Sequence, residues 1–323
     1  MSLAAPFPYF GGKRRAAPTI WRALGDPSGY VEPFAGSAAV LLARPHFKGR
    51  RVETINDLDG WLVNVWRALQ LSPHETAAHA VGPVAEIDYH ARLAWLQERR
   101  TPDLASWLEG DPEAHDPKAA GWWLYVTACG IGDPFGPGPW RVIDGKFTDT
   151  RKLPHLGDAG KGVNRELPHL GDAGQGVFAY FDQLAARLHR VRITCGSWER
   201  VVRPSVTRSG TGGDSTRAVF LDPPYATSGD LYAESTAGVA EKVRDWCETS
   251  TDGLRVILCG YDTEHDALLS HGWAVVDGKA GGGAGYSTNS ANGRRERLWL
   301  SPECVSAHQD TLDFGGGHHA PTH

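Results

Sequence analysis

Four consecutive residues, Asp222-Pro223-Pro224-Tyr225, follow a short apolar run and place three chemical functions in one turn. The carboxylate accepts hydrogen bonds, the prolines lack N–H donors and leave the Pro223 carbonyl free to accept, and the tyrosine offers an aromatic face. An exocyclic amine on a flat heterocycle needs these groups: two acceptors for its N–H hydrogens and a surface on which to stack. A plain strand-terminating turn is the alternative interpretation, since Asp-Pro turns are common.

A glycine turn closes an earlier apolar run, in Glu32-Pro33-Phe34-Ala35-Gly36-Ser37. Such a turn lets a cofactor approach the backbone at a helix N-terminus, although the spacing is not the GxGxxG dinucleotide fingerprint. Asp57 ends the next predicted strand, where an acid commonly accepts from ribose hydroxyls in doubly wound folds. Taken alone, each of the two acids is better explained as a solvated strand end.

A third motif, Pro8-Tyr9-Phe10-Gly11-Gly12-Lys13, lies near the N-terminus. Its Gly-Gly turn, flanked by an aromatic ring and a lysine, is able to wrap a ligand. A simple capping turn explains the same residues, so the motif by itself is weak.

The spacing of apolar residues along the sequence predicts the strands and helices that must position these motifs. Short apolar runs predict buried strands at 30–34, 51–57, 191–195, 218–222, 254–259, 273–276 and 298–300. Helical period predicts helices from residue 37 and over 58–69, 178–188, 239–247 and 262–269. Between these regular parts the pattern degrades, with short helices expected near 89–99 and 122–129, separated by Gly/Pro loops. The chain is therefore expected to be one α/β sheet domain interrupted by an irregular insertion.

The order of these motifs resembles the Dam-type family of DNA adenine-N6 methyltransferases, the alpha class of amino-methyltransferases. An aromatic-x-GGK motif comes first, then VEPFxGS, an acid after the second strand, a long insertion, and DPPY last. The LWLSP ending also resembles phage and prophage members. The resemblance covers about 6–70 and 178–302. The insertion resembles that of the family only in its position and its length.

The resemblance implies a Rossmann-like S-adenosylmethionine-dependent methyltransferase sheet of seven strands. Residues 1–70 and 178–302 would form the cofactor-binding catalytic domain, and residues 71–177 a mostly helical and loop target-recognition domain. The tail at 303–323 lacks apolar period and is expected to be disordered.

The resemblance also implies the roles of individual residues. The flipped adenine would be held by Asp222, Pro223 and Tyr225, and the cofactor would be bound by Tyr9, Lys13, Glu32, Phe34, Gly36, Asp57, Ser197 and Asp222. Two positions depart from the family pattern. Ser197 stands where relatives commonly have Asp, and it accepts without a charge. Ala38 replaces the usual second glycine, a change we expect to be mild because alanine also fits a helix start.

The chemistry implied is direct methyl transfer from S-adenosylmethionine to an adenine flipped out of the duplex. No Pro-Cys nucleophile occurs in the sequence, which argues against cytosine-C5 methylation. A methyltransferase acting on RNA or on cytosine N4 stays an alternative, because motifs of the DPPY kind serve those reactions too. A catalytically silent DNA-binding relative is the alternative from another class, which the Ser197 and Ala38 departures allow.

The net charge of −5 excludes a uniformly basic nucleic-acid surface, so contacts with double-stranded DNA must come from local patches. Residues 151–217 hold 11 Lys/Arg against 6 Asp/Glu, a balance of +5 (11 − 6). This segment begins with a tandem repeat, LPHLGDAGKGV at 153–163 and LPHLGDAGQGV at 167–177. The candidate DNA-binding residues are Arg14, Arg15, His155, His169, Arg294 and Arg295. A solvated face is the alternative for any one cluster.

The composition narrows the class of protein. No apolar stretch approaches the roughly 20 residues that span a bilayer, and the N-terminal residues lack a secretory h-region. Five scattered cysteines without a CxxC pair suggest neither a metal site nor a disulfide framework. We therefore expect a cytoplasmic protein, nucleoid-associated or phage-encoded, without a metal. A partner restriction nuclease and the oligomeric state are left open.

Deleting residues 153–166 tests whether the repeats recognise DNA. Because glycine lets the backbone approach a duplex closely, we expect the deletion to reduce DNA affinity or specificity and to leave S-adenosylmethionine binding nearly unchanged. Gel-shift titration, sequencing of methylated DNA and calorimetry measure these three quantities. An unaltered DNA affinity and methylated sequence would exclude the repeats from the recognition surface, whereas unfolding would favour a structural hairpin.

Overall fold

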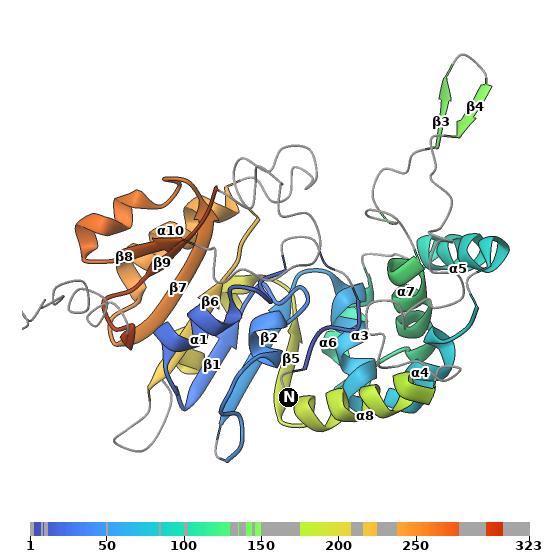
Figure 1. Ribbon diagram of the computed structural model, residues 1–323, viewed down its shortest axis with the longest axis horizontal. Helices are drawn as coiled ribbons and strands as arrows, with labels where there is room; N and C mark the ends of the chain where they lie inside the picture. Colours follow the sequence, from blue (N-terminus) through green and yellow to red (C-terminus); the bar gives the residue numbers. More distant parts are fainter. Residues whose placement is uncertain are drawn as a thin grey trace, which may run out of the picture. The chain divides into compact units, whose positions relative to one another are not determined.

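The computed structural model describes residues 3–7, 9, 12–49, 51–83, 85–99, 103–129, 135, 140–143, 146–149, 175–207, 216–224, 238–277 and 295–305. Seven strands form one mixed sheet in the order β5-β2-β1-β6-β7-β9-β8 (Figure 1). They are β1 Gly29–Glu32, β2 Val52–Asp57, β5 Val191–Cys195, β6 Arg217–Leu221, β7 Leu254–Tyr261, β8 Ala274–Asp277 and β9 Glu296–Leu300. The predicted α/β class with a Rossmann-like sheet is confirmed.

Strand direction places the ends of the central strands together. β1 pairs with β6 in parallel, and β6 pairs with β7 in parallel. β9 runs antiparallel to both β7 and β8. All four residues of β1 and the last four of β6 are buried, which is why both read as unbroken apolar runs in the sequence. The carboxyl ends of β1, β6 and β7 therefore lie on one edge of the sheet, the edge where open α/β sheets bind ligands.

The chain divides into two compact units. The first comprises Met1–Gly12, Ala35–Leu42 and Thr54–Arg200. Its α-helices are α2 Ala39–Leu42, α3 Gly60–Leu71, α4 Pro73–Ala80, α5 Glu86–Glu98, α6 Asp103–Gly110, α7 Pro117–Cys129 and α8 Gln175–Leu188. It also holds the hairpin of β3 Trp140–Ile143 and β4 Lys146–Asp149, and the 3-10 helix η4 Trp198–Arg200.

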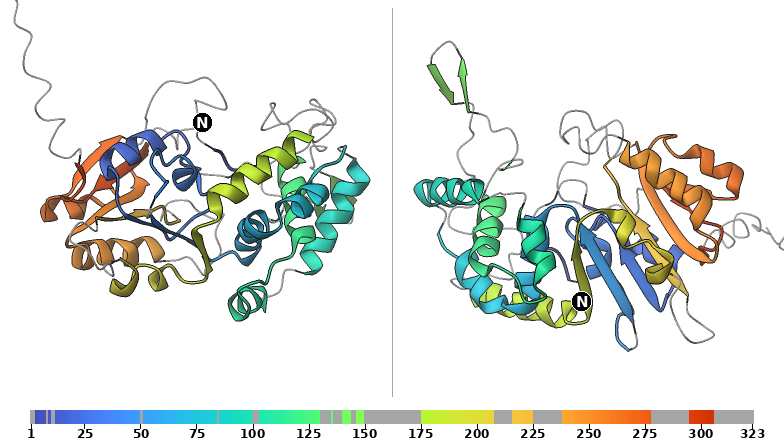
Figure 2. Two further views of the ribbon diagram at one scale, coloured as in Figure 1. Left: turned by 90° about the horizontal axis from the view of Figure 1, so that it is seen from below. Right: turned by 180° about the vertical axis from the view of Figure 1, so that it is seen from behind.

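Helix α7 is the centre of packing in the first unit, in contact with α3, α4 and α5 (Figure 2). Nearly all of its residues from Ala119 to Cys129 are buried. Gly121 allows α7 to lie close against α4, because a Cβ there would lie 2.4 Å from the Cβ of His79 and 2.6 Å from the carbonyl oxygen of Thr76. The buried guanidinium of Arg67, on α3, donates to the carbonyls of Leu108, Asp111 and Pro112 and so fixes the end of α6.

The second unit comprises Lys13–Phe34, Ala43–Glu53 and Val201–His323. It holds α1 Ala17–Leu24, β1, α9 Pro204–Thr207, β6, α10 Val239–Ser250, β7, the 3-10 helix η6 Asp266–His271, β8 and β9. Arg44 is buried here, with its guanidinium 3.0 Å from the Glu53 carboxylate and stacked 5.1 Å from the ring of Trp21. Arg44 thereby links β2, which contains Glu53, to α1, which contains Trp21.

Several predicted boundaries are corrected by the structure. The first strand ends at Glu32 rather than at residue 34, and the last begins at Glu296 rather than at 298. The helix expected over 262–269 is a 3-10 helix at Asp266–His271. Helices α1, α4 and α6 and the β3–β4 hairpin were not predicted. The repeats fall outside the described residues apart from the start of α8, and only 303–305 of the predicted tail is described. The assignment of 71–177 as a target-recognition domain stays a prediction.

Candidate active site

In the first unit, the carboxylate of Asp57 ties the glycine turn to the end of β2. Its Oδ2 accepts from the backbone N–H of Gly36 at 2.9 Å, and its Oδ1 accepts from that of Asp59 at 3.0 Å. One residue earlier, the N–H of Ala35 donates to the carbonyl of Asn56 at 2.9 Å. The turn that follows β1 and the acid that ends β2, predicted separately from the sequence, are therefore in direct contact.

Gly36 occupies a position that strongly favours glycine. Its φ is +47°, and an added Cβ would lie 2.6 Å from Cε1 of Tyr9. Its carbonyl accepts from Nε1 of Trp66 at 3.0 Å. The backbone of this turn is thus held by a side chain of α3 and lies directly against the ring of Tyr9, which keeps 41% of its surface exposed.

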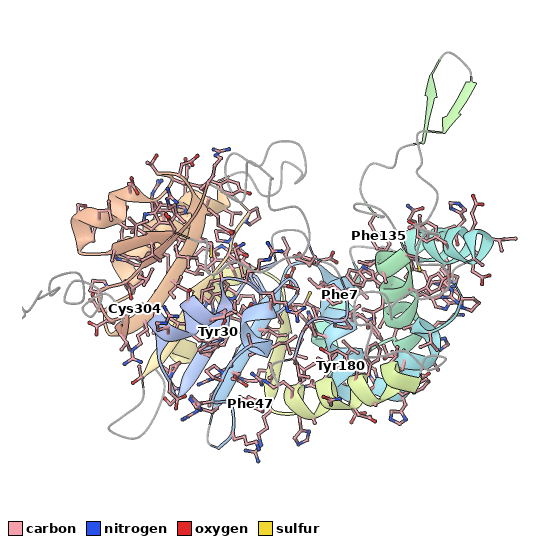
Figure 3. All side chains as sticks on the ribbon, in the orientation of Figure 1. Phe7, Tyr30, Phe47, Phe135, Tyr180 and Cys304 are labelled. Carbon is pink, nitrogen blue, oxygen red and sulfur yellow. The ribbon has the colours of Figure 1, made fainter. Side chains whose placement is uncertain are left out.

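The N-terminal segment that carries Tyr9 is anchored by buried aromatic residues. Phe7 packs 4.9 Å from Trp123 and 5.5 Å from Trp66, measured between ring centroids, and Figure 3 labels it. The hydroxyl of Tyr180 donates to the carbonyl of Ala4 at 2.6 Å and accepts from its N–H at 2.7 Å. These contacts explain how so short a segment presents the Tyr9 ring at a defined place.

Ser197 follows a residue that is hydrogen-bonded to the end of β2. The N–H of the preceding Gly196 donates to the backbone carbonyl of Asp57 at 2.9 Å, and the Gly196 carbonyl accepts from Nδ2 of Asn56 at 2.9 Å. Ser197 itself is exposed. The structure thus brings the predicted residues Tyr9, Gly36, Asp57 and Ser197 to the carboxyl ends of β2 and β5.

Burial changes the acidity of Asp57. Desolvation raises the pKa of its carboxyl to about 6, although the N–H donors of Asp59 and Gly36 act in the opposite direction. The carboxyl therefore titrates near neutral pH, which is unusual for an aspartate.

In the second unit, Asp222 follows β6 and is paired with Lys13. Nζ of Lys13 lies 2.8 Å from Oδ2 of Asp222 and 2.9 Å from Oε1 of Glu296. The lysine side chain is 4% exposed, and the two carboxylates are 21% and 23% exposed. Burial alone would lower the pKa of Lys13, but Asp222, with Cys259 and Glu296, outweighs it and raises that pKa well above its ordinary value. Lys13 is therefore an ammonium at neutral pH.

Glu32 is the last residue of β1 and is 2% exposed. Its Oε2 accepts from the hydroxyl of Tyr30 at 3.0 Å (Figure 3 labels Tyr30). Burial, followed by the charge of Glu32, raises the pKa of that phenol. Because Val31 is in register with Val219 on β6, Glu32 lies at the same end of the sheet as Asp222.

Sequence reasoning missed two residues around Asp222. Glu296 opens β9 and carries no motif, and Cys259 lies within an apolar strand. The thiol of Cys259 is buried, which raises its pKa, and it hydrogen-bonds to Asp222. Only the three-dimensional register brings these side chains together.

The predicted DNA-binding residues are placed in part. Arg14 and Arg15 are exposed beside Lys13. Arg295 pairs with Asp262 at 2.6 Å and stacks 5.2 Å from the ring of Tyr261. His155, His169 and Arg294 lie outside the described residues, as does Tyr225 of the DPPY motif.

The expectation that Ala38 is a mild replacement is wrong in its physical reason. Ala38 does not start the helix in helical conformation, because its φ is +47° and α2 begins one residue later. An L-residue in this left-handed region costs roughly 1–2 kcal/mol. The departure from glycine is therefore a strained position, fully buried next to the Gly36 turn.

Ala38→Gly is expected to raise the free energy of unfolding by about 0.5–1 kcal/mol. Relief of the left-handed strain exceeds the roughly 0.5–1 kcal/mol that glycine costs through unfolded-chain freedom. Urea denaturation followed by tryptophan fluorescence measures the change. Ala39→Gly is the matched control, which should lower stability by about 1 kcal/mol because Ala39 is helical. Equal losses at both positions would contradict the strain at Ala38.

One comparison with known proteins gives a match. The family model for D12 class N6 adenine-specific DNA methyltransferase matches residues 9–84. The matched range contains the N-terminal glycine motif, the turn after β1, the acid of β2 and the whole of α3. No curated protein matches the chain.

No described helix combines the length and apolar character that crossing a membrane requires. No group of three or more His, Cys, Asp or Glu side chains among the described residues is placed to hold a metal ion.

Proposed function

We propose that this chain, whose residues 9–84 match the family model for D12 class N6 adenine-specific DNA methyltransferase, transfers a methyl group from S-adenosylmethionine to the N6 amine of an adenine at a specific DNA site. The observation that carries this proposal is Asp222, held in place by Lys13 at the carboxyl end of β6 and followed by two prolines. An ionised acceptor at this edge of the sheet matches what an exocyclic amine requires.

The residues around the Asp57 turn fit the cofactor. The carboxylate of Asp57 accepts backbone N–H groups of Gly36, Leu58 and Asp59, and two oxygens with about four acceptor sites leave capacity for a ribose hydroxyl. The exposed ring of Tyr9 suits the adenine of the cofactor, and Ser197 offers an acceptor without a charge. Glu32 and Phe34 are assigned to the same cofactor by their places in the motif. When bound, S-adenosylmethionine supplies an electrophilic sulfonium methyl.

The groups after β6 would activate the target amine. The lone pair of an adenine N6 is delocalised into the ring, so the amine is a poor nucleophile. Hydrogen bonds from its two N–H groups to Asp222 and to the Pro223 carbonyl would favour a pyramidal nitrogen, and Tyr225 would stack on the base. Positioning and electrostatic stabilisation then carry most of the rate, without a covalent intermediate.

DNA would be bound through local cationic patches. Arg14 and Arg15 are exposed immediately after the residue that holds Asp222, where they are suited to contact phosphates. Residues 71–177 would read the target sequence, with His155 and His169 in the repeats as candidates for contacts to bases or phosphates. The target base must leave the duplex to reach Asp222.

Incubating the protein with S-adenosylmethionine and either DNA or RNA tests this function. Mass spectrometry of the digested nucleosides should find N6-methyladenine in DNA. Methylation of RNA alone, or N4-methylcytosine in DNA, would support the alternative reactions instead. Binding of DNA without any methylated base would indicate a silent relative.

Asp222→Ala is expected to abolish methyl transfer, since the amine loses its charged acceptor. The rate of transfer to DNA measures the effect, and binding of S-adenosylmethionine checks that the protein is folded. A rate within about tenfold of wild type, or roughly 1.4 kcal/mol in barrier, would contradict the role of Asp222.

Cofactor affinity should increase with pH through about 6. Hydroxyl donors bind an ionised carboxylate more strongly than a protonated one, and Asp57 ionises with a pKa of about 6. Calorimetry from pH 5 to pH 8 should therefore show the dissociation constant falling through this window and levelling above it.

Asp57→Asn should weaken binding at neutral pH by about tenfold and remove the rise with pH. Asp182→Asn, at an exposed carboxylate of α8, is the control and should keep both. A wild-type affinity that is flat from pH 5 to pH 8 would exclude Asp57 as a cofactor ligand.

A further inference from the structure

Three neighbouring strands converge on the ammonium of Lys13. On β6 and β7, Leu221 is in register with Leu258, which sets Asp222 level with Cys259. On β7 and β9, Tyr261 is in register with Glu296, two residues beyond Cys259. Asp222 and Glu296 thus come from strands that do not touch each other, and Lys13 is the group that bridges them.

The charges of this cluster do not cancel. One buried ammonium faces two carboxylates, so the three groups carry a net charge of −1. A lone Asp222–Lys13 pair would be neutral. The lysine charge would then reduce the hydrogen-bond acceptor strength of the aspartate oxygens more strongly. With Glu296 as second partner, Nζ of Lys13 is shared, and Asp222 keeps more of its strength as an acceptor.

The geometry of the cluster also indicates that Glu296 orients the ammonium of Lys13. A lysine has a flexible stem, and a single ion pair leaves its ammonium several positions. Contacts of 2.8 Å and 2.9 Å to carboxylates on two different strands fix Nζ between them. The atom that orients Oδ2 of Asp222 is thereby oriented by Glu296.

We propose that Glu296 is a positioning residue for methyl transfer, which acts by holding Lys13 so that Lys13 fixes and partly neutralises Asp222. This inference rests on the proposed function, since it assigns a role within the same reaction. Glu296 does not contact the substrate amine in this account. Its removal should therefore lower the rate of transfer and leave cofactor binding unchanged.

The test compares Glu296→Gln with wild type in single-turnover methyl transfer to DNA and in S-adenosylmethionine binding. The transfer rate should fall about 10- to 100-fold, while the dissociation constant changes by less than about twofold. Glu296→Asp keeps the charge and should recover most of the rate. Asp277→Asn is the matched control, because Asp277 pairs with Arg297, the neighbour of Glu296 on β9, and should leave the rate unchanged.

A double-mutant cycle shows whether Glu296 acts through Lys13. In a Lys13→Met background, Glu296→Gln should cause no further loss of rate. A further loss of about tenfold there, or a single Glu296→Gln rate within about twofold of wild type, would overturn the inference. If Glu296→Gln alone does not fold, the inference is tested by comparing the transfer rate of Lys13→Met with that of the double variant Lys13→Met, Glu296→Gln. Failure of wild type to methylate adenine would instead overturn the proposed function, and this inference with it.

Discussion

The buried ammonium of Lys13 is the interaction on which the arrangement around Asp222 depends. A charge with 4% of its side chain exposed is tolerated only when opposite charges compensate its lost hydration. Two carboxylates do so, one following β6 and one opening β9, and the Lys13 carbonyl accepts the N–H of Ala17 at the start of α1. A residue near the N-terminus thereby fixes side chains that lie far apart in the sequence.

Charged groups are stabilised in different ways in the two units. Around Lys13, a cation is paired with two carboxylates on the same end of the sheet. Around Asp57, the carboxylate accepts backbone N–H groups, and burial raises its pKa to about 6. The first arrangement fixes an acceptor by ion pairing, and the second leaves an acceptor whose pKa is raised by burial.

Much of the fold could be predicted from the sequence, because the buried strands are apolar on both faces. β6 and β7 read directly as strands, and the acid that follows β6 was found with its prolines. Helix α4 was missed, since its buried face is made of small residues, Thr76, Ala77 and Ala80, which carry little hydrophobic signal. Glu296 was missed because an ion pair across strands leaves no local motif. The strain at Ala38 was missed because a sequence does not report φ.

The most direct test of this account is the ionisation of Lys13 itself. In protein labelled with ¹⁵N-lysine, the Nζ signal of Lys13, assigned by comparison with Lys13→Met, reports its protonation state. At about pH 11, above the usual lysine pKa of about 10.4, Lys13 should still be an ammonium because two carboxylates surround it. A Lys13 signal that loses its proton at or below about pH 10.4 would contradict the charge-paired site.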